Sequence, residues 1–236
     1  MSRKTPLTPD GIAAAAVAIA DAEGLDAVSM RRVAGDLGVS AMALYRHVAD
    51  RNDLLLMMAG AATAEFSLLG PGTHTWQQVL AHMADAQWKA FTAHRWLLRI
   101  VLTPRRLVNM ASPGDVERIL ATLASAGLSE EQGFDCLLGI SAAVIGTSAI
   151  TAAAHYGPAF DGQPAPADGG QGEWKDGTAV ALHPRAARFQ QQGITYAGSR
   201  RSLDFFVANF IAGVEQTLAQ DQDLPTGSAT RKEKEG

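Results

Sequence analysis

Apolar residues recur at spacings of three and four along most of the chain, the pattern that is typical of amphipathic α-helices. The six clearest runs are Ile12–Leu25, Leu54–Leu69, Val79–Phe91, Val116–Leu128, Phe134–Ile150 and Leu203–Leu218. No alternating run of β-branched residues between turn residues stands out, so we expect no sheet. The pattern therefore predicts an all-α protein.

Two breaks divide these helical runs. Gly70–Thr75 is the shorter break, and Tyr156–Gly177 collects glycine and proline residues into a long connection that we expect to be mobile. After Gln220 the chain turns polar, which predicts a disordered tail over 221–236. We therefore predict an N-terminal three-helix domain over residues 1–53 and a C-terminal helical domain over residues 54–220.

Composition narrows the class of protein. The chain has 236 residues, of which 47% are apolar and 19% charged, with a formal net charge of −4. This balance favours a folded protein and means that any basic surface has to be local. The single cysteine, Cys136, excludes an intramolecular disulfide and a cysteine-based zinc site, and it favours a reducing compartment. We expect a cytoplasmic protein.

Two segments imitate export or membrane signals. Ile12–Ala20 follows two basic residues, as in a short signal peptide, but Pro9 and Asp10 interrupt that pattern and favour a helix start. Cys136–Ala154 carries no charge over nearly the length of a membrane span, yet it consists largely of small residues that supply little transfer free energy. Both segments are interpreted as helices of a soluble protein, with no membrane partner.

The segment Gly24–Asp53 carries the clearest motif. Ser29 is suited to cap a short helix that Gly38 ends with a left-handed residue, and Ser40 is suited to cap a second short helix that runs through Val48. Two short helices joined by a glycine turn are typical of a helix-turn-helix.

The packing positions of this motif hold suitable residues. Ala34 is small where the two helices are expected to cross, and Val39 and Leu44 are expected to fill the wedge between them. Asp50 is expected to cap the following helix, with Asp53 as an acidic variant of the capping box.

The charges of the motif favour DNA as its partner. Arg31 and Arg32 lie in the first turn of the first short helix, where they oppose the helix dipole by a few tenths of a kcal/mol, roughly, unless an anion is near. A phosphate or a guanine edge would offset that cost. The first turn of the second helix, over residues 40–43, is uncharged and suited to approach the major groove closely.

The runs Gly24–Ala34, Leu37–Ser40 and Ala43–Val48 resemble the DNA-binding domain of the tetracycline-repressor (TetR) family of transcription regulators. The resemblance covers Thr8–Leu69, about the first quarter of the chain, and the remainder matches only in architecture. It implies a homodimer that binds double-stranded operator DNA through its N-terminal domains and a small-molecule inducer through its C-terminal domains.

The resemblance also implies roles for single residues. Ala41, Met42 and Ala43 would face base edges, where they can touch thymine methyl groups but make no bidentate bond. Arg31 and Arg46 would then supply hydrogen-bonded base readout, although Arg46 stands where the family often has an aromatic residue and reads either a base or only a phosphate. The implied phosphate contacts are Ser29, Ser40, Tyr45, His47 and Arg51, and Tyr45 is equally suited to a core position.

Two C-terminal stripes are suited to dimerisation through the helices of residues 134–155 and 200–220. Small residues form the first stripe, namely Gly139, Ala142, Ala143, Gly146, Ala149 and Ala153, and bulky apolar residues form the second, namely Leu203, Phe206, Val207, Phe210, Val214 and Leu218. The alternative is that both stripes are buried within one subunit.

Aromatic and polar residues in the C-terminal half are candidates for a ligand pocket. These are Trp88, Phe91, His94, Trp96, Arg99, Phe134, Ile145, Thr147, Ser148 and Trp174. Ordinary core positions are the alternative for most of them.

Enzymatic motifs are missing from the sequence. The six histidines lack metal-ligand spacing, and neither a phosphate-binding glycine loop nor a nucleophile elbow occurs. We therefore expect no enzyme, no metal and no cofactor. The resemblance to the TetR family implies a ligand-responsive repressor, and the alternative is a small-molecule sensor or carrier that no longer binds DNA.

Overall fold

Helices make up all the regular secondary structure of the residues that the computed structural model describes, which are 6–66, 72, 74–102, 112–156, 182–196 and 198–223. This confirms the all-α prediction. The N-terminal helices are α1 (Pro9–Glu23), the short 3₁₀ helix η1 (Leu25–Ala27), α2 (Met30–Asp36), α3 (Ala41–Leu44) and α4 (Arg51–Ala64). The C-terminal helices are α5 (Trp76–Ala93), α6 (Leu97–Val101), α8 (Pro113–Ser125), α9 (Glu130–Tyr156), α11 (Pro184–Tyr196) and α12 (Arg200–Asp223).

Local capping chemistry explains where several of these helices begin. The Thr8 hydroxyl oxygen accepts from the Gly11 N–H at 3.1 Å, and Pro9 occupies the first turn of α1. Helix α5 begins with a full capping box, in which the Gln78 N–H donates to Thr75 Oγ1 at 3.3 Å and the Thr75 N–H donates to Gln78 Oε1 at 3.0 Å. These starts depend on residues within one turn of the helix.

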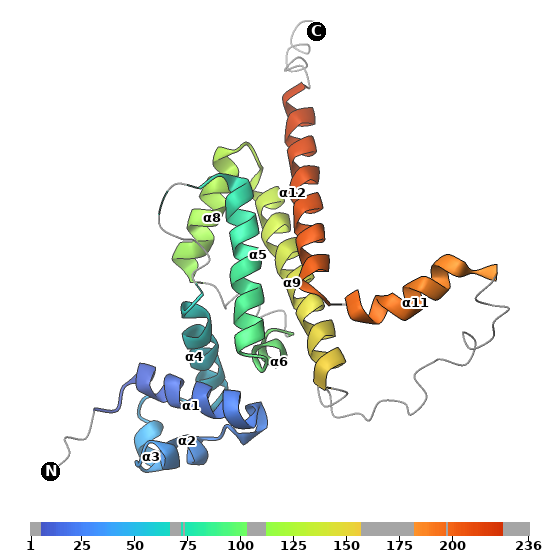
Figure 1. Ribbon diagram of the computed structural model, residues 1–236. Coiled ribbons are helices and arrows are strands. Elements are labelled where there is room, and N and C mark those ends of the chain that lie inside the picture. Colours follow the sequence, from blue (N-terminus) through green and yellow to red (C-terminus); the bar gives the residue numbers. More distant parts are fainter. Residues whose placement is uncertain are drawn as a thin grey trace, which may run out of the picture.

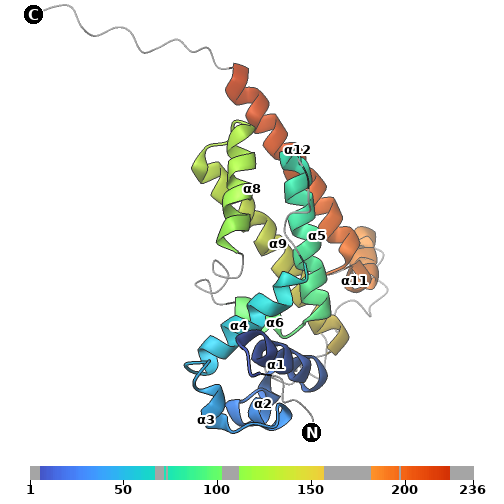
Figure 2. The ribbon, with the colours of Figure 1, turned by 90° about the vertical axis from the view of Figure 1, so that its left-hand side faces the viewer.

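The N-terminal helices lie at one end of the molecule, with α1 crossing α4 (Figures 1 and 2). Their shared core contains fully buried side chains on three helices, namely Ile12, Leu44, Leu54 and Met58. Helix α4 leaves this core and also contacts α5 and α6, so it joins the two halves of the chain. The predicted division between residues 53 and 54 falls inside α4.

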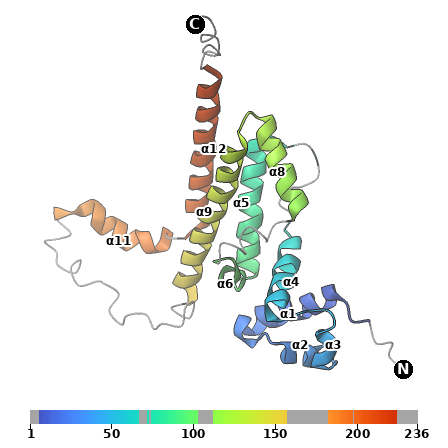
Figure 3. The ribbon, with the colours of Figure 1, turned by 180° about the vertical axis from the view of Figure 1, so that it is seen from behind.

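The C-terminal helices form a bundle in which α5 packs against α8 and α9, and α12 lies along α9 (Figures 1 and 3). Within the described residues, Glu130–Ala153 of α9 is long and apolar enough to cross a membrane, and 33% of its most apolar window is buried. Because α9 packs against α5, α6, α8 and α12, it is a central helix of this bundle.

Several details differ from the sequence pattern. Helices α6 and α11 were not predicted, because α6 is only five residues long and α11 is mostly polar. Helix α12 continues to Asp223, into the stretch predicted as a disordered tail. The rest of that tail, over 224–236, and most of the predicted mobile connection, over 157–177, lie outside the described residues.

Candidate nucleic-acid interface and domain junction

Gly38 forms the turn between α2 and α3. Its φ of +65° lies in the left-handed region that glycine adopts at little cost. The Val39 N–H donates to the Ala34 carbonyl at 2.9 Å and the Gly38 N–H donates to the Gly35 carbonyl at 3.2 Å. These two bonds make a Schellman motif, so the predicted glycine turn is confirmed.

The residues expected to pack between the two short helices are buried or lie against the core. Ala34 is 2% exposed and Leu44 is fully buried, while Val39 packs against the same core. Val48 is also fully buried just after α3. The hydrophobic positions predicted for the helix-turn-helix therefore lie together in one core.

Helix α3 is shorter than the sequence suggested. The α-helix covers only Ala41–Leu44, and the chain continues in tighter turns in which the Arg46 N–H donates to the Ala43 carbonyl at 3.4 Å and the His47 N–H to the Leu44 carbonyl at 2.8 Å. The expectation that the helix runs through Val48 is therefore wrong. The tightening accompanies the return of the chain to the core at Val48.

Beyond the buried residues, α3 and its following turn face solvent. Met42 is 73% exposed and Tyr45 is 49% exposed, and Arg46 and His47 are also exposed. The alternative of Tyr45 as a core aromatic is therefore excluded. Ser40 occupies the N-cap position without a capping bond from its side chain, which leaves its hydroxyl available to an outside group.

The neighbouring arginines of α2 have different surroundings. Arg32 Nη2 lies 2.6 Å from Glu23 Oε1 and Arg32 Nη1 lies 3.4 Å from Asp36 Oδ1, and these carboxylates, Glu23 first, raise the pKa of Arg32. Arg31 is exposed and makes no ion pair with any described residue. Of the two arginines predicted to oppose the helix dipole, Arg31 is the one available to an external anion.

The start of α4 is held by two aspartates. Asp50 Oδ1 accepts from the Asp53 N–H at 2.9 Å, as predicted, and Asp53 Oδ2 accepts from the Ala49 N–H at 2.9 Å. The return bond reaches one residue before the cap instead of the cap itself. This arrangement fixes the first turn of α4, where exposed Arg51 places Nη2 3.5 Å from the Leu25 carbonyl oxygen.

His94 and Trp96, two of the predicted ligand contacts, direct polar atoms at the N-terminal half. His94 Nδ1 lies 2.9 and 3.1 Å from the two carboxylate oxygens of Asp21, and Trp96 Nε1 donates to Asp21 Oδ1 at 2.7 Å. Both rings are buried. Asp21 lies in the last turn of α1, where a carboxylate opposes the helix dipole, and that local conflict was the available sequence signal for a tertiary partner.

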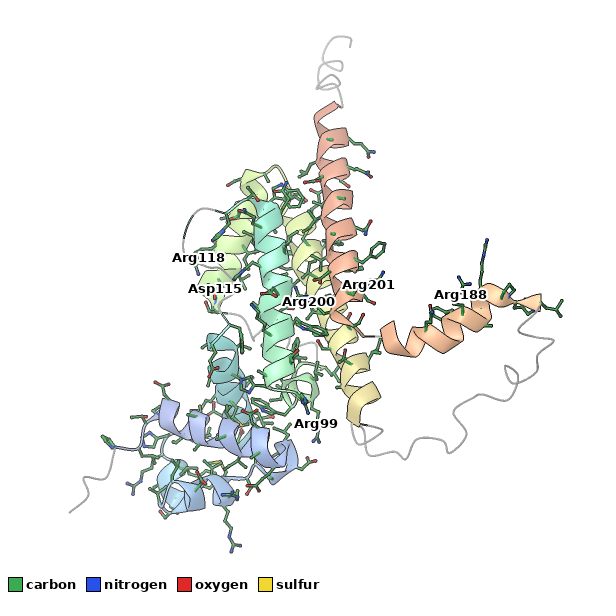
Figure 4. The ribbon with its side chains drawn as sticks, in the orientation of Figure 1. Arg99, Asp115, Arg118, Arg188, Arg200 and Arg201 are labelled. Atoms are coloured by element: carbon green, nitrogen blue, oxygen red, sulfur yellow. The ribbon has the colours of Figure 1, made fainter. Side chains whose placement is uncertain are left out.

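Arg99, a third predicted ligand contact, makes the second polar link of this junction. Its Nη1 and Nη2 donate to Asp26 Oδ2 and Oδ1 at 2.9 and 3.0 Å, a bidentate pair. The Arg99 hydrogen bonds and charge lower the pKa of Asp26, with a smaller effect of the Arg51 charge. Figure 4 shows Arg99 at the end of the bundle that faces the N-terminal helices.

The remaining predicted ligand residues are divided between α5 and α9. Phe91 is buried and Trp88 half-buried on α5, while Ser148 is buried and Ile145 and Thr147 are half-buried on α9. Phe134 is exposed at the other end of α9, and Trp174 lies outside the described residues. The structure therefore brings some of the predicted residues to adjoining helices and leaves Phe134 apart from them.

The small-residue stripe of α9 is also divided. A Cβ atom at Gly139 would lie 3.4 Å from the Phe210 ring, so this position packs against α12 of the same chain. Ala142, Gly146 and Ala153 are exposed, and a Cβ at Gly146 would meet no atom within 4 Å. One part of the stripe is half-buried and packs within the subunit, and another part stays open.

Both halves of the chain match known protein families. Residues 12–58 match the family described as bacterial regulatory proteins, tetR family, and residues 70–218 match the tetracyclin repressor-like C-terminal domain. These two families correspond to the N-terminal and C-terminal helices described above.

Individual relatives agree with the family matches. The HTH-type transcriptional repressor DrrR1 of Streptomyces coeruleorubidus is 33% identical over 146 residues, covering 61% of this chain and 54% of that protein. The class E tetracycline repressor protein of Escherichia coli is 28% identical over 145 residues, covering 59% of this chain and 66% of that protein. The match thus spans between half and two thirds of the length of these relatives.

A solved structure extends the likeness to most of the chain. ActR of Streptomyces coelicolor in complex with actinorhodin has a TM-score of 0.66 and 28% identity, and the match covers 91% of this chain and 99% of that one. Regulatory proteins of this kind are not enzymes, which confirms the prediction of a non-enzymatic protein. The chain belongs to the tetR family of bacterial regulatory proteins.

Proposed function

We propose that the protein is a cytoplasmic transcriptional repressor that binds operator DNA through α2 and α3 and leaves it when a small molecule binds the C-terminal bundle. The carrying observation is the surface of the helix-turn-helix. It presents the uncharged turn Ala41–Ala43 beside exposed Arg31 and Arg46, neither of which has an ion-pair partner among the described residues. We place the DNA-binding domain at 1–53 and the ligand-binding and dimerisation domain at 54–220.

The surroundings of the α2 and α3 residues support a division of labour on DNA. Met42, flanked by Ala41 and Ala43, offers apolar contact to thymine methyl groups, while Arg31 and Arg46 supply the charged donors for base edges. Phosphates would be held by the more peripheral donors, namely Ser29, Ser40, Tyr45, His47 and Arg51. Ser40 supports this assignment because its hydroxyl is not used in capping.

Homodimerisation through α9 and α12 would bury apolar surface that the single chain leaves exposed. Phe134, Leu138 and Ile150 on α9 and Phe205 and Phe206 on α12 are large apolar side chains at the surface. An apolar patch of this kind is unfavourable in water unless a partner covers it. A two-fold dimer would also present two reading elements to successive major grooves.

Release by a small molecule rests on a population shift. ActR, which shares the fold and 28% identity, has been solved with actinorhodin, and this supports a ligand site in the C-terminal bundle here. The contacts of His94, Trp96 and Arg99 with Asp21 and Asp26 connect that bundle to the N-terminal helices. A coupling of about 1–3 kcal/mol per site, acting twice in a dimer, would lower the occupancy of an operator substantially.

A direct test is a gel-shift titration of the full chain against DNA that flanks its own coding region, at fixed salt and with scrambled DNA of the same length as competitor. We expect a dimer to bind one flanking segment at least about a thousandfold more tightly than the scrambled DNA. A protein that folds and dimerises yet shows equal affinity for both DNAs would contradict the repressor function and favour a sensor without DNA binding.

A further inference from the structure

The chain enters α12 through a contact with α9 that leaves no room for a side chain. Gly198 lies just before α12, is buried and has a φ of +71°. A Cβ atom at this position would lie 2.6 Å from the Thr151 nitrogen, 2.7 Å from Thr151 Oγ1 and 2.8 Å from the Thr147 carbonyl oxygen. Ordinary van der Waals contacts of a Cβ atom begin at 3.4 Å, so only glycine fits here without a movement of one of the two segments.

Two of the three atoms that Gly198 approaches belong to the backbone of α9. The Thr151 N–H and the Thr147 carbonyl are four residues apart, the spacing of groups that pair inside an α-helix, so they yield less easily than the end of a side chain would. Thr151 Oγ1 lies within hydrogen-bond distance of the Gly198 carbonyl oxygen and 2.9 Å from the Thr147 carbonyl oxygen. The entry into α12 is therefore placed against a rigid part of α9.

Arg200 holds the first turn of α12 on the side of α5. Its Nη1 lies 2.7 Å from Asp85 Oδ1 on α5, and its Nε lies 2.7 Å from Asp204 Oδ1 one turn further along α12. Lys89 Nζ lies 2.7 Å from the other oxygen of Asp85. Figure 4 shows Arg200 near the start of α12, where that helix passes α5. The first turn of α12 is thus held by both α5 and α9.

A second glycine contact lies further along the same two helices. A Cβ atom at Gly139 of α9 would meet the Phe210 ring of α12 at 3.4 and 3.5 Å. Because α9 and α12 run antiparallel (Figure 3), this contact lies nearer the start of α9 and further along α12 than the Gly198 contact. The two contacts are about 18 Å apart along the helices. Contacts with this separation set both the position and the tilt of α12 on α9.

The surface that these contacts arrange is apolar and exposed in the single chain. Ile150 precedes Thr151 on α9, and Phe205 and Phe206 lie in the first two turns of α12. The tilt of α12 therefore sets where the two phenylalanines lie relative to Ile150. In a two-fold dimer the same patch is used by both copies, so a change in its shape occurs on both sides of the interface.

We propose that Gly198 is a positioning residue for homodimerisation, because its lack of a side chain lets α12 pack on α9 at the tilt at which two copies of the exposed patch fit together. This inference rests on the proposed dimeric repressor and adds the residue that sets the geometry of the dimer. An alanine methyl at Gly198 has to displace the entry into α12 by about 0.8 Å. With the Gly139 contact as a pivot about 18 Å away, α12 then tilts by roughly 2–3°.

The test compares Gly198→Ala with Gly127→Ala in the full chain. Gly127 is the matched control because it also has a positive φ, +102°, and also faces α12, yet a Cβ atom there would meet Leu218 Cδ2 at an ordinary 3.6 Å. Both variants strain the backbone, whereas only Gly198→Ala displaces α12. Sedimentation equilibrium is measured at a temperature at which circular dichroism shows both variants folded. The dimer dissociation constant is expected to rise at least about tenfold in Gly198→Ala and to stay within about threefold of wild type in Gly127→Ala.

Several outcomes of this comparison would overturn the inference. An unchanged dissociation constant in Gly198→Ala is one, and a wild-type chain that stays monomeric is another. An equal rise in Gly127→Ala is the third, because backbone strain alone would then explain the loss.

A second pair of variants replaces Gly198→Ala if that variant does not fold. Thr151→Val removes the hydroxyl beside the Gly198 carbonyl without adding bulk and is expected to raise the dissociation constant by about threefold or more. Thr151→Ser keeps the hydroxyl and should stay near wild type. Equal dissociation constants for these two variants would overturn the inference.

A DNA measurement separates positioning from a simple loss of stability. Operators whose two half-sites are moved together or apart by one base pair, about 3.4 Å, are titrated with each protein above its dimer dissociation constant. Gly198→Ala is expected to reduce the preference for the native spacing at least about threefold, because the tilt alters the separation of the two reading elements, while Gly127→Ala keeps that preference. An unaltered preference in Gly198→Ala would make Gly198 a stability residue and overturn its positioning role.

Failure of the inference and failure of the proposed function are distinguishable, because sedimentation requires no DNA. Dimers that respond to Gly198→Ala as expected, in a chain that binds no operator, would support the role of Gly198 and contradict the repressor function. Specific operator binding by wild type and both glycine variants, with equal dissociation constants and equal spacing preferences, would keep the repressor function and remove the role of Gly198.

Discussion

Arg31 and Arg32 are neighbours in the chain, yet alanine substitutions at these two positions are expected to have different effects. Arg31→Ala should weaken operator binding, and Arg32→Ala should mainly lower stability. Arg31 is exposed without an ion-pair partner among the described residues, whereas Arg32 is paired with Glu23 and Asp36. If Arg31 reads a base through two hydrogen bonds, Arg31→Ala removes about 1–3 kcal/mol of operator binding, a loss of roughly 5- to 150-fold. The melting temperature is expected to stay unchanged, because the Arg31 side chain makes no hydrogen bond or ion pair with a described residue.

Arg32→Ala is the matched control for Arg31→Ala. Its two ion pairs lie at the surface, where such pairs contribute about 0.2–1 kcal/mol each to folding. We expect a small fall in melting temperature and a loss of operator affinity of less than about threefold, because those carboxylates already occupy its guanidinium.

The assay is fluorescence anisotropy with operator and scrambled DNA, at two salt concentrations, for wild type and both variants. Arg31→Ala should lower the ratio of operator to scrambled affinity and relax the preference at one base position. An equal loss on both DNAs would reduce Arg31 to a phosphate contact. A loss in Arg32→Ala as large as that in Arg31→Ala would refute the reasoning from ion-pair partners.

Three further predictions concern other parts of the chain. Gly38→Ala is expected to lower the free energy of unfolding by about 1–2 kcal/mol in a denaturant titration. The cause is backbone strain at a φ of +65°, because an added Cβ would meet no atom within 4 Å. Gly38→Asn should recover part of the lost stability, and an unchanged stability of Gly38→Ala would contradict backbone strain as the cause. Arg51→Ala should weaken operator and scrambled DNA alike and reduce the salt slope by about one, and a sequence-dependent loss would contradict its phosphate role. The hydrogen bonds from Lys89 and Arg200, together with their charges, lower the pKa of Asp85. The stabilisation by these two partners is therefore present above the unfolded pKa of about 3.9 and is lost as the pH falls through the lower folded value. Asp85→Asn should remove this acid dependence from thermal unfolding, and an unchanged pH profile would contradict it.

Much of the local structure was predictable because it depends on residues close together in sequence. The Thr8 and Asp50 caps, the left-handed Gly38 and the small Ala34 at the helix crossing each act within a turn or two of helix. The DNA-facing residues could be proposed for the same reason, since a helix-turn-helix is a local motif that brings its own geometry.

Partners distant in sequence were not predictable in the same way. Hydrophobic periodicity did not indicate that His94 and Trp96 would meet Asp21, or that Arg99 would meet Asp26, because these pairs form only when the bundle packs on α1 and η1. The sequence analysis assigned His94, Trp96 and Arg99 to a ligand pocket, because aromatic and polar residues suit a pocket and a domain junction equally well. Trp174, which lies outside the described residues, remains a prediction.

The sequence by itself determined the helical class, the helix-turn-helix and its exposed turn, because short-range spacing and capping specify them. Only the tertiary structure decided which of the two adjacent arginines has an ion-pair partner on α1, and which polar atoms of the bundle are buried without a partner among the described residues. Ion pairs and burial depend on groups that the fold brings together from distant parts of the chain. Arg31 and Arg32 are the same residue type at adjacent positions, and the approach of Glu23 from the end of α1 makes them different.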